Sequence, residues 1–259
     1  MKIEKFGFGD IVLNIIVGVH GDENAPVKGF FLLKEYLKHK KIKKAFQVIV
    51  ANEGALENNK RFIEKDLNRC FPGNASGCHE ERLANNILEE VLKVDINFDF
   101  HSTTIQIEKP YGIVSVYNEK SRKIMMMTGV KEYIFDSSES LIKFAPNSLA
   151  YEVGWEIDPK SSNNAFSIMK NILINFDIID EELDYKPYNP EIYLIYHFIL
   201  KSKFSSISND LQDFKYVEKD EVIGWTKSGE IFLASEGFYP VFTKDDFMIK
   251  KCKKITIEE

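Results

Sequence analysis

The sequence predicts an α/β fold, a mixed sheet with helices on both faces, followed by a small all-β part. Segments of strand and helix character alternate between residues 11 and 100, the pattern of an α/β sheet. After residue 187, short β-rich segments separated by turns follow one another. We therefore expect two domains, residues 1–187 and residues 188–259.

Hydrophobic periodicity assigns each expected element of the first half. A β-rich apolar run indicates a buried strand, and apolar residues at helical spacing indicate a helix. Lysines late in a helical segment suit its C-terminus. The elements expected on this basis are a strand at 11–19, a helix at 26–40, a strand at 45–51, a helix at 79–93, a strand at 95–100 and a helix at 161–176.

Two prolines, Pro187 and Pro190, interrupt regular structure and separate this half from the tail. The tail is expected to form strands at 192–200, 221–225, 230–233, 238–242 and 254–257. In α/β sheets, ligands bind beyond the carboxyl ends of the strands. His20 and His101 each stand just past an expected strand, so that edge is the expected site.

Composition narrows the class of function. The 40 acidic and 34 basic residues give a net charge of -6, which disfavours non-specific nucleic-acid binding. The three cysteines are too few and too scattered for a disulfide framework and suit a reducing cytosol. The longest apolar runs are too short to span a bilayer. We expect a cytoplasmic protein with no membrane partner.

Two short motifs carry residues that suit a zinc ion. His20-Gly21-Asp22-Glu23 follows the first strand, and Asp99-Phe100-His101-Ser102-Thr103 spans the end of the third. Imidazole nitrogen and carboxylate oxygen are zinc ligands, and a catalytic site commonly uses three of them. Alone, the first motif is a weak signal, because a histidine and a glutamate three residues apart more often mark an ordinary surface turn. His39 is expected to be solvated and His197 to be packed, while Glu80 and Glu81 suit the positive end of a helix.

Two further motifs carry charge. The segment 61–73 contains Arg61, Asn68 and Arg69, and arginine binds carboxylates in a bidentate way or stabilises an oxyanion. Its alternative is a solvated loop with ordinary ion pairs. Glu152, in Tyr151-Glu152-Val153-Gly154, could act as a general base. On its own it is only an acidic residue in a strand.

These four motifs, in this order over residues 10–160, resemble the aspartoacylase and succinylglutamate desuccinylase family of the zinc carboxypeptidase clan. The resemblance implies a zinc-carboxypeptidase-like sheet with a C-terminal β domain capping the site. It also implies one zinc ion per chain, held by His20, Glu23 and His101. Arg61 would polarise the scissile carbonyl, Asn68 and Arg69 would bind a substrate carboxylate, and Glu152 would be the catalytic base.

The sequence departs from the family pattern at two places. Glu53 stands where members often have proline, and Lys143 stands near the position of an arginine that reads a second carboxylate. Lysine is a point charge that lacks the planar fork of arginine. Lys143 is therefore the candidate for that role. Asp99 is expected to orient a ligating histidine, and Tyr239 is near the position of a tyrosine that the tail sends to the site.

The expected activity is zinc-dependent hydrolysis of an N-acetyl or N-succinyl amino acid, an acidic one by preference, by metal-activated water. One alternative is carboxypeptidase-like hydrolysis of a peptide or cell-wall fragment. Another is a binding protein that has lost catalysis, which the retention of all the motif residues disfavours. A small pocket roofed by the tail favours the amidohydrolase, and an open groove favours the peptidase. A homo-oligomer is compatible with the sequence.

Overall fold

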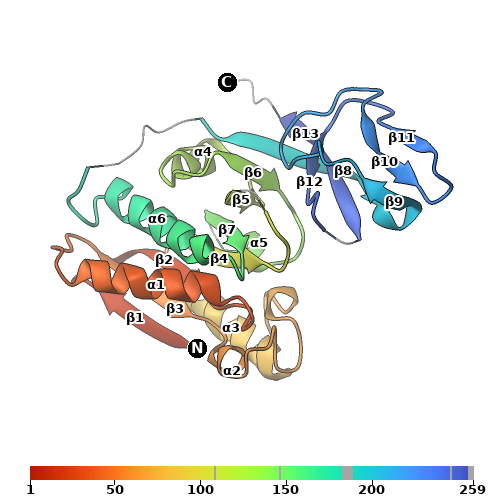
Figure 1. The fold of residues 1–259 in the computed structure, drawn as a ribbon. Coiled ribbons are helices and arrows are strands. Elements are labelled where there is room, and N and C mark those ends of the chain that lie inside the picture. The colour runs from red at the N-terminus through yellow and green to blue at the C-terminus, as the bar shows by residue number, and fades with distance from the viewer. Residues whose placement is uncertain (108, 146, 183–188, 246, 256–259) are drawn as a thin grey trace.

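The computed structural model describes residues 1–107, 109–145, 147–182, 189–245 and 247–255. Thirteen strands and six α-helices are found there (Figure 1). The strands are β1 (Lys2–Phe6), β2 (Ile11–Val17), β3 (Ala45–Val50), β4 (Asn97–Thr103), β5 (Tyr111–Val114), β6 (Glu132–Phe135), β7 (Ser148–Trp155), β8 (Glu191–Leu200), β9 (Phe204–Ile207), β10 (Val222–Thr226), β11 (Ile231–Leu233), β12 (Tyr239–Val241) and β13 (Met248–Ile255). The helices are α1 (Asn24–Leu37), α2 (Glu53–Glu57), α3 (His79–Val91), α4 (Glu119–Met126), α5 (Leu141–Phe144) and α6 (Pro159–Asn175), with short 3-10 turns η1 (Leu67–Arg69) and η2 (Lys201–Lys203).

Ten strands form one mixed sheet in the order β1-β3-β2-β4-β7-β5-β6-β8-β13-β12. Its centre, β3-β2-β4-β7, is parallel, whereas β1, β5, β12 and β13 introduce antiparallel pairs. The predicted mixed α/β fold is therefore confirmed. No strand was expected before residue 11. β1 was not predicted because this edge strand is half-exposed and carries charged residues instead of an apolar run.

Helices cover both faces of the sheet, as predicted. Leu13, Ile15 and Val17 of β2 belong to the core shared with α1 and α6, whereas Ile16 faces the core shared with α3. This alternation is the two-residue period of a strand. α1 and α6 lie side by side in Figure 1, and Gly29 permits their close approach. A Cβ atom at Gly29 would lie 2.6 Å from the Cβ of Ala165.

The strands of the tail divide between two sheets. β8 pairs with β6 and with β13 and so extends the main sheet, while β9, β10 and β11 form the small extra β-sheet. The expected domain boundary at 187/188 falls in residues 183–188, outside the described part of the chain. The last strand was expected at 254–257, but β13 begins at Met248, because its pairing with β8 starts there.

Within the described ranges, no helix is long and apolar enough to cross a membrane.

Candidate active site

Three expected metal ligands converge at the edge of the parallel strands. His20 lies just beyond β2, Glu23 is the N-cap residue of α1, and His101 lies inside β4. The strand was expected to end before His101. It continues to Thr103 because His101 and Thr103 still pair with Glu152 and Trp155 of β7. One donor atom from each of the three side chains lies within 4.8 Å of the others.

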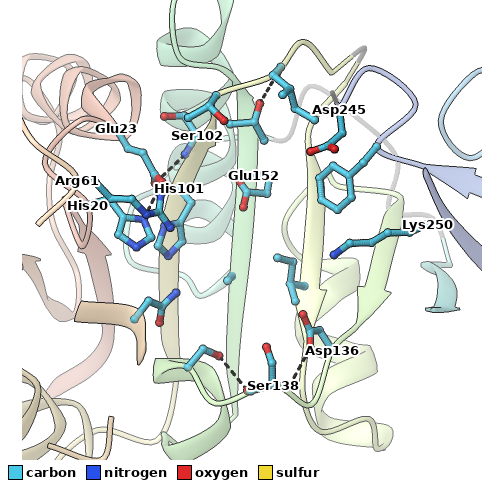
Figure 2. A pocket seen from close by; sticks show the side chains of 18 of the residues that line it. His20, Glu23, Arg61, His101, Ser102, Asp136, Ser138, Glu152, Asp245 and Lys250 are labelled. Carbon is cyan, nitrogen blue, oxygen red and sulfur yellow. Dashed lines mark hydrogen bonds and ion pairs between the residues drawn. The ribbon is translucent and has the colours of Figure 1, made fainter. Parts of the chain in front are cut away.

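The side chain of Glu23 connects the two imidazole rings (Figure 2). Its Oε1 atom is 2.7 Å from Nδ1 of His20, and its Oε2 atom is 2.9 Å from Nδ1 of His101. All three residues are buried. The nitrogen and oxygen atoms that face one another are the atom types that bind zinc.

The other nitrogen of each ring, Nε2, is in contact with one further carboxylate. Nε2 of His20 lies 3.0 Å from Oδ1 of Asp66, and Nε2 of His101 lies 2.9 Å from Oδ2 of Asp99. Metal-binding histidines almost always make such a contact, which fixes the ring orientation and raises the basicity of the ligand. The residues present therefore fit a zinc ion. Asp99 has the expected position, whereas the role of Asp66 was missed, because nothing local distinguishes it from other loop aspartates.

The residues of this cluster shift one another's pKa values. Burial lowers the pKa of His20, but hydrogen bonds to Asp66 and Glu23 outweigh it, so the net pKa is raised. Burial likewise opposes protonation of His101, yet the charges of Asp99 and Glu23 raise its pKa well above the usual value. Burial alone would raise the pKa of Glu23, but His101 and His20 depress it strongly. A cation at this position would displace protons from the imidazoles, so its affinity should rise with pH.

Arg61 reaches the ligand cluster from the segment between α2 and η1. Its Nη1 atom donates to Oε1 of Glu23 at 3.2 Å, and its Nε atom donates to Oδ2 of Asp66 at 3.1 Å. The side chain is 39% exposed, so one side of the guanidinium is accessible. Arg61 is thus in direct contact with Glu23, one of the three expected metal ligands.

The buried carboxylate of Glu80 holds the segment that carries Arg61 and Asn68. Glu80 lies in the first turn of α3 and is 0% exposed. It accepts backbone hydrogen bonds from Ile63 at 2.7 Å and from Glu64 and Lys65 at 3.1 Å each. Burial would raise its pKa, but these bonds lower it. The expectation that Glu80 serves chiefly the helix dipole missed this clamp, which depends on contacts distant in sequence.

Replacing Glu80 with alanine should therefore damage both stability and substrate binding. Three backbone N–H donors would lose their buried acceptor, at a cost of about 3 to 5 kcal/mol in unfolding free energy. KM should rise because Arg61, Asn68 and Arg69 lose their support. Urea unfolding and steady-state kinetics measure these effects. The control is Glu81→Ala, which removes the contacts of Glu81 with Cys78 and Lys65 and leaves the three bonds from residues 63–65 to Glu80 in place. Equal changes in unfolding free energy and KM in both variants would show that Glu80 has no special role in holding residues 63–65.

Asn68 and Arg69 lie in η1 and line the same cavity as Arg61. The side-chain oxygen of Asp66 caps this turn by accepting from Asn68 N–H at 3.0 Å. The side-chain oxygen of Asn68 accepts from the backbone N–H of Leu141 at 3.1 Å. Both Asn68 and Arg69 line the cavity, so the structure brings the predicted carboxylate-binding pair next to the metal-ligand cluster.

Glu152 points into the cavity between the His101 side and the residues of the tail (Figure 2). It is opposite His101 in the pairing of β4 and β7. Its Oε2 atom is buried and has no hydrogen-bond partner among the described residues. Burial, followed by the negative charge of Glu23, raises its pKa to about 7. A carboxyl group with this pKa can both accept and donate a proton near neutral pH.

The cavity has a volume of about 840 Å³ and is bounded partly by the tail. The predicted residues that line it are His20, Glu23, Arg61, Asn68, Arg69, Asp99, His101 and Glu152. The tail contributes Phe198, Leu200, Phe242, Asp245, Phe247, Met248 and Lys250. The tail residues were missed because the pairing of β8 with β13 brings them here, and no local motif reveals that pairing.

The structure does not bring Lys143 to the cavity. Among the described lining residues Lys143 is absent; it lies in α5 with its Nζ atom 3.6 Å from Oε1 of Glu139. The lysine that does line the cavity is Lys250 of β13, whose Nζ atom lies 4.6 Å from the centre of the Phe242 ring. Tyr239 packs against Tyr193, with ring centres 5.1 Å apart, and is also not among the lining residues described.

Comparisons with known proteins agree with the sequence resemblance. A model of the succinylglutamate desuccinylase/aspartoacylase catalytic domain matches residues 11–140, half of the chain. The chain is similar to a succinylglutamate desuccinylase of Idiomarina loihiensis, with 21% identity over 91% of this chain and 78% of that protein. A probable aspartoacylase of Nostoc sp. is 36% identical over 35% of this chain and 34% of its own length.

The fold comparison extends over almost the whole chain. The crystal structure of a succinylglutamate desuccinylase/aspartoacylase from Rhodobacter sphaeroides superposes with a TM-score of 0.74 at 15% identity. The match covers 98% of this chain and 89% of that one. The fold and the site thus define a hydrolase of the kind that removes acyl groups from amino acids. The chain belongs to the succinylglutamate desuccinylase/aspartoacylase family.

Proposed function

We propose that this protein is a zinc-dependent amidohydrolase that cleaves the amide bond of an N-acyl amino acid. One observation carries the proposal: the donor atoms of His20, Glu23 and His101 converge beside the buried carboxylate of Glu152. When bound there, zinc supplies a Lewis acid that polarises the carbonyl and lowers the pKa of water.

The side chains divide the remaining chemistry between them. Glu152 takes a proton from the water that attacks the carbonyl carbon and passes it to the amine nitrogen as the C–N bond breaks. Burial raises the pKa of this carboxyl group, which favours the second transfer, the return of the proton to the amine. Arg61 donates to the oxygen that becomes negative in the transition state, and one such donor contributes about 3 kcal/mol. Asp66 and Asp99 hold the imidazoles in place.

Asn68 and Arg69 are proposed to bind the α-carboxylate of the substrate, because amide and guanidinium N–H groups suit a carboxylate. For the second carboxylate of an acidic substrate, Lys143 is poorly placed, and Lys250 is the lysine that reaches the cavity. Among the described residues no ion pair involves Lys250, whose Nζ atom lies over the Phe242 ring. Its ammonium group is therefore available to a ligand anion.

Replacing Lys250 with alanine should raise KM about tenfold for a dicarboxylic substrate and leave kcat nearly unchanged. Loss of one ion pair of about 1.4 kcal/mol in the bound state gives that factor. The matched control is Lys143→Ala, which should change neither constant. Steady-state kinetics on N-acetylaspartate and N-acetylalanine measure both variants. A larger rise in KM in Lys143→Ala than in Lys250→Ala would show that Lys143 binds the second carboxylate.

The shape of the cavity favours the amidohydrolase over the peptidase alternative. Its volume of about 840 Å³ lies within the range of small-ligand sites. Tail residues such as Phe198, Phe247 and Met248 form one of its walls. A wall in this position would obstruct a long peptide that extends past the scissile bond.

The direct test is release of free amino acid from a panel of N-acetyl and N-succinyl amino acids by the zinc-loaded protein. Peptides with a free C-terminus are assayed in parallel. Cleavage of one or more N-acyl amino acids with no peptide turnover is the expected result. Cleavage of peptides alone would establish the peptidase alternative in its place.

A further inference from the structure

Glu156 follows β7 immediately and is attached to the end of β4. Its backbone N–H donates to the carbonyl oxygen of Thr103 at 2.9 Å. One carboxylate oxygen, Oε2, accepts two hydrogen bonds at once. The first comes from the backbone N–H of Ala25 at 2.9 Å, and the second comes from Oγ of Ser102 at 2.6 Å. Neither the sequence motifs nor the proposed mechanism gives Glu156 a role.

The two partners of Glu156 belong to the two segments that carry metal ligands. Ala25 lies in the first turn of α1, two residues after Glu23, and Ser102 directly follows His101. The backbone N–H of Ser102 also donates to Oε2 of Glu23 at 3.2 Å. A closed set of contacts therefore joins Glu156, the start of α1, Glu23 and the strand of His101.

Glu156 provides a hydrogen-bond acceptor that the N-cap residue of α1 does not provide. Glu23 occupies the N-cap position, yet its side chain makes no capping hydrogen bond. Its two oxygens face His20 and His101 instead. The first N–H groups of a helix need an outside acceptor, and an anion there also interacts favourably with the helix dipole. Glu156 supplies this acceptor and leaves Glu23 for the metal position.

A bulge in β7 sets the position of Glu156. His101 pairs with Glu152 and Thr103 pairs with Trp155, so β7 holds one more residue than β4 between these pairs. Gly154 lies in this bulge with φ of 140°, and a Cβ atom there would lie 2.3 Å from Oγ of Ser161. Bulges commonly redirect a strand beside an active site. Here the extra residue places Glu156 where its N–H reaches Thr103.

We infer that Glu156 is a positioning residue that sets the distance between Glu23 and His101 and thereby the affinity for zinc. This inference rests on the metal site of the proposed function. In other metal sites, loss of a group that supports a ligand costs about 10- to 100-fold in metal affinity. A helix cap that served folding alone would change stability and leave the metal affinity unchanged.

The experiment measures zinc affinity of the full chain by competition with a chromophoric chelator, together with the thermal midpoint of the metal-free protein. Glu156→Ala should weaken zinc binding about 10- to 100-fold. Glu156→Gln should stay within a few-fold of the parent protein, because the amide oxygen still accepts both bonds. Ser102→Ala, which removes one of the two bonds, should weaken binding less than Glu156→Ala.

The matched control is Asp158→Ala. Asp158 caps α6 by accepting from Lys160 N–H at 2.9 Å and lies only two residues away from Glu156. Its loss should lower the thermal midpoint and leave zinc affinity unchanged. Unchanged affinity in Glu156→Ala, or an equal loss in Asp158→Ala, would overturn the inference alone. No zinc binding by the unsubstituted protein would overturn the proposed function and this inference with it.

Discussion

Replacement of Glu152 by glutamine is expected to reduce kcat by about 10²- to 10⁴-fold while the protein keeps its zinc. Glutamine preserves the size of the side chain but cannot accept a proton from water at neutral pH. Steady-state kinetics and metal analysis of the same preparation measure the two quantities. Glu156→Gln is the matched control, since it makes the same chemical change four residues away and should retain most of the activity. Activity of Glu152→Gln close to that of the parent would exclude Glu152 as the base.

The pH dependence of the same group supplies a second measure of this prediction. Burial and the charge of Glu23 raise the pKa of Glu152 from 4.5 to about 7 in the metal-free protein, and a bound cation would lower it. Because the base acts only when ionised, kcat/KM should fall as pH falls through a midpoint between 4.5 and about 7.

Stability of the metal-free protein should respond in the opposite sense. An acid whose folded pKa exceeds its unfolded pKa destabilises the fold once it is ionised, so stability is lost as pH rises from 4.5 through about 7. Above that range, Glu152→Gln should stabilise the metal-free protein by up to about 3 kcal/mol. Urea unfolding at pH 5 and pH 8 measures the difference. Equal stability of both proteins at pH 8 would contradict the burial of a charge at Glu152.

Replacement of His101 by alanine is expected to abolish activity by loss of the metal. Zinc sites with four protein ligands bind with roughly 10 to 16 kcal/mol, so loss of one ligand should weaken binding at least about 100-fold. Asp99 and Glu23 would also lose a shared partner, which should destabilise the metal-free protein. Metal analysis after dialysis and chelator competition measure the affinity. His39→Ala, at an exposed position after α1, is the control and should change nothing. Retention of stoichiometric zinc by His101→Ala would remove His101 from the ligand set.

The parts of the site that could be predicted are those whose residues lie close together in sequence beside a strand. His20 and Glu23 are three residues apart after a buried strand, and His101 follows another expected strand, residues 95–100. The four-motif resemblance added Arg61, Asn68, Arg69 and Glu152, and all of these line one cavity. The alternating strand and helix pattern likewise predicted the mixed sheet with helices on both faces.

The parts that could not be predicted depend on contacts between distant segments. Glu80 and Glu81 are neighbours with the same side chain, yet only Glu80 is buried against the backbone of residues 63–65. Lys250 enters the cavity because β13 pairs with β8, whereas Lys143, the nearer residue in the motif order, pairs with Glu139. His197 was expected to be packed, but it is exposed on β8. Residue type alone cannot separate these cases.

The most direct measurement is amino-acid release as a function of zinc added to the metal-free protein, with the best substrate of the N-acyl panel. If a single zinc ion is catalytic, no amino acid is released before zinc is added, release rises linearly to one zinc per chain, and it then stays constant. Full release by the metal-free protein in the presence of chelator, or a rise that continues well past one zinc per chain, would contradict a single catalytic zinc at His20, Glu23 and His101.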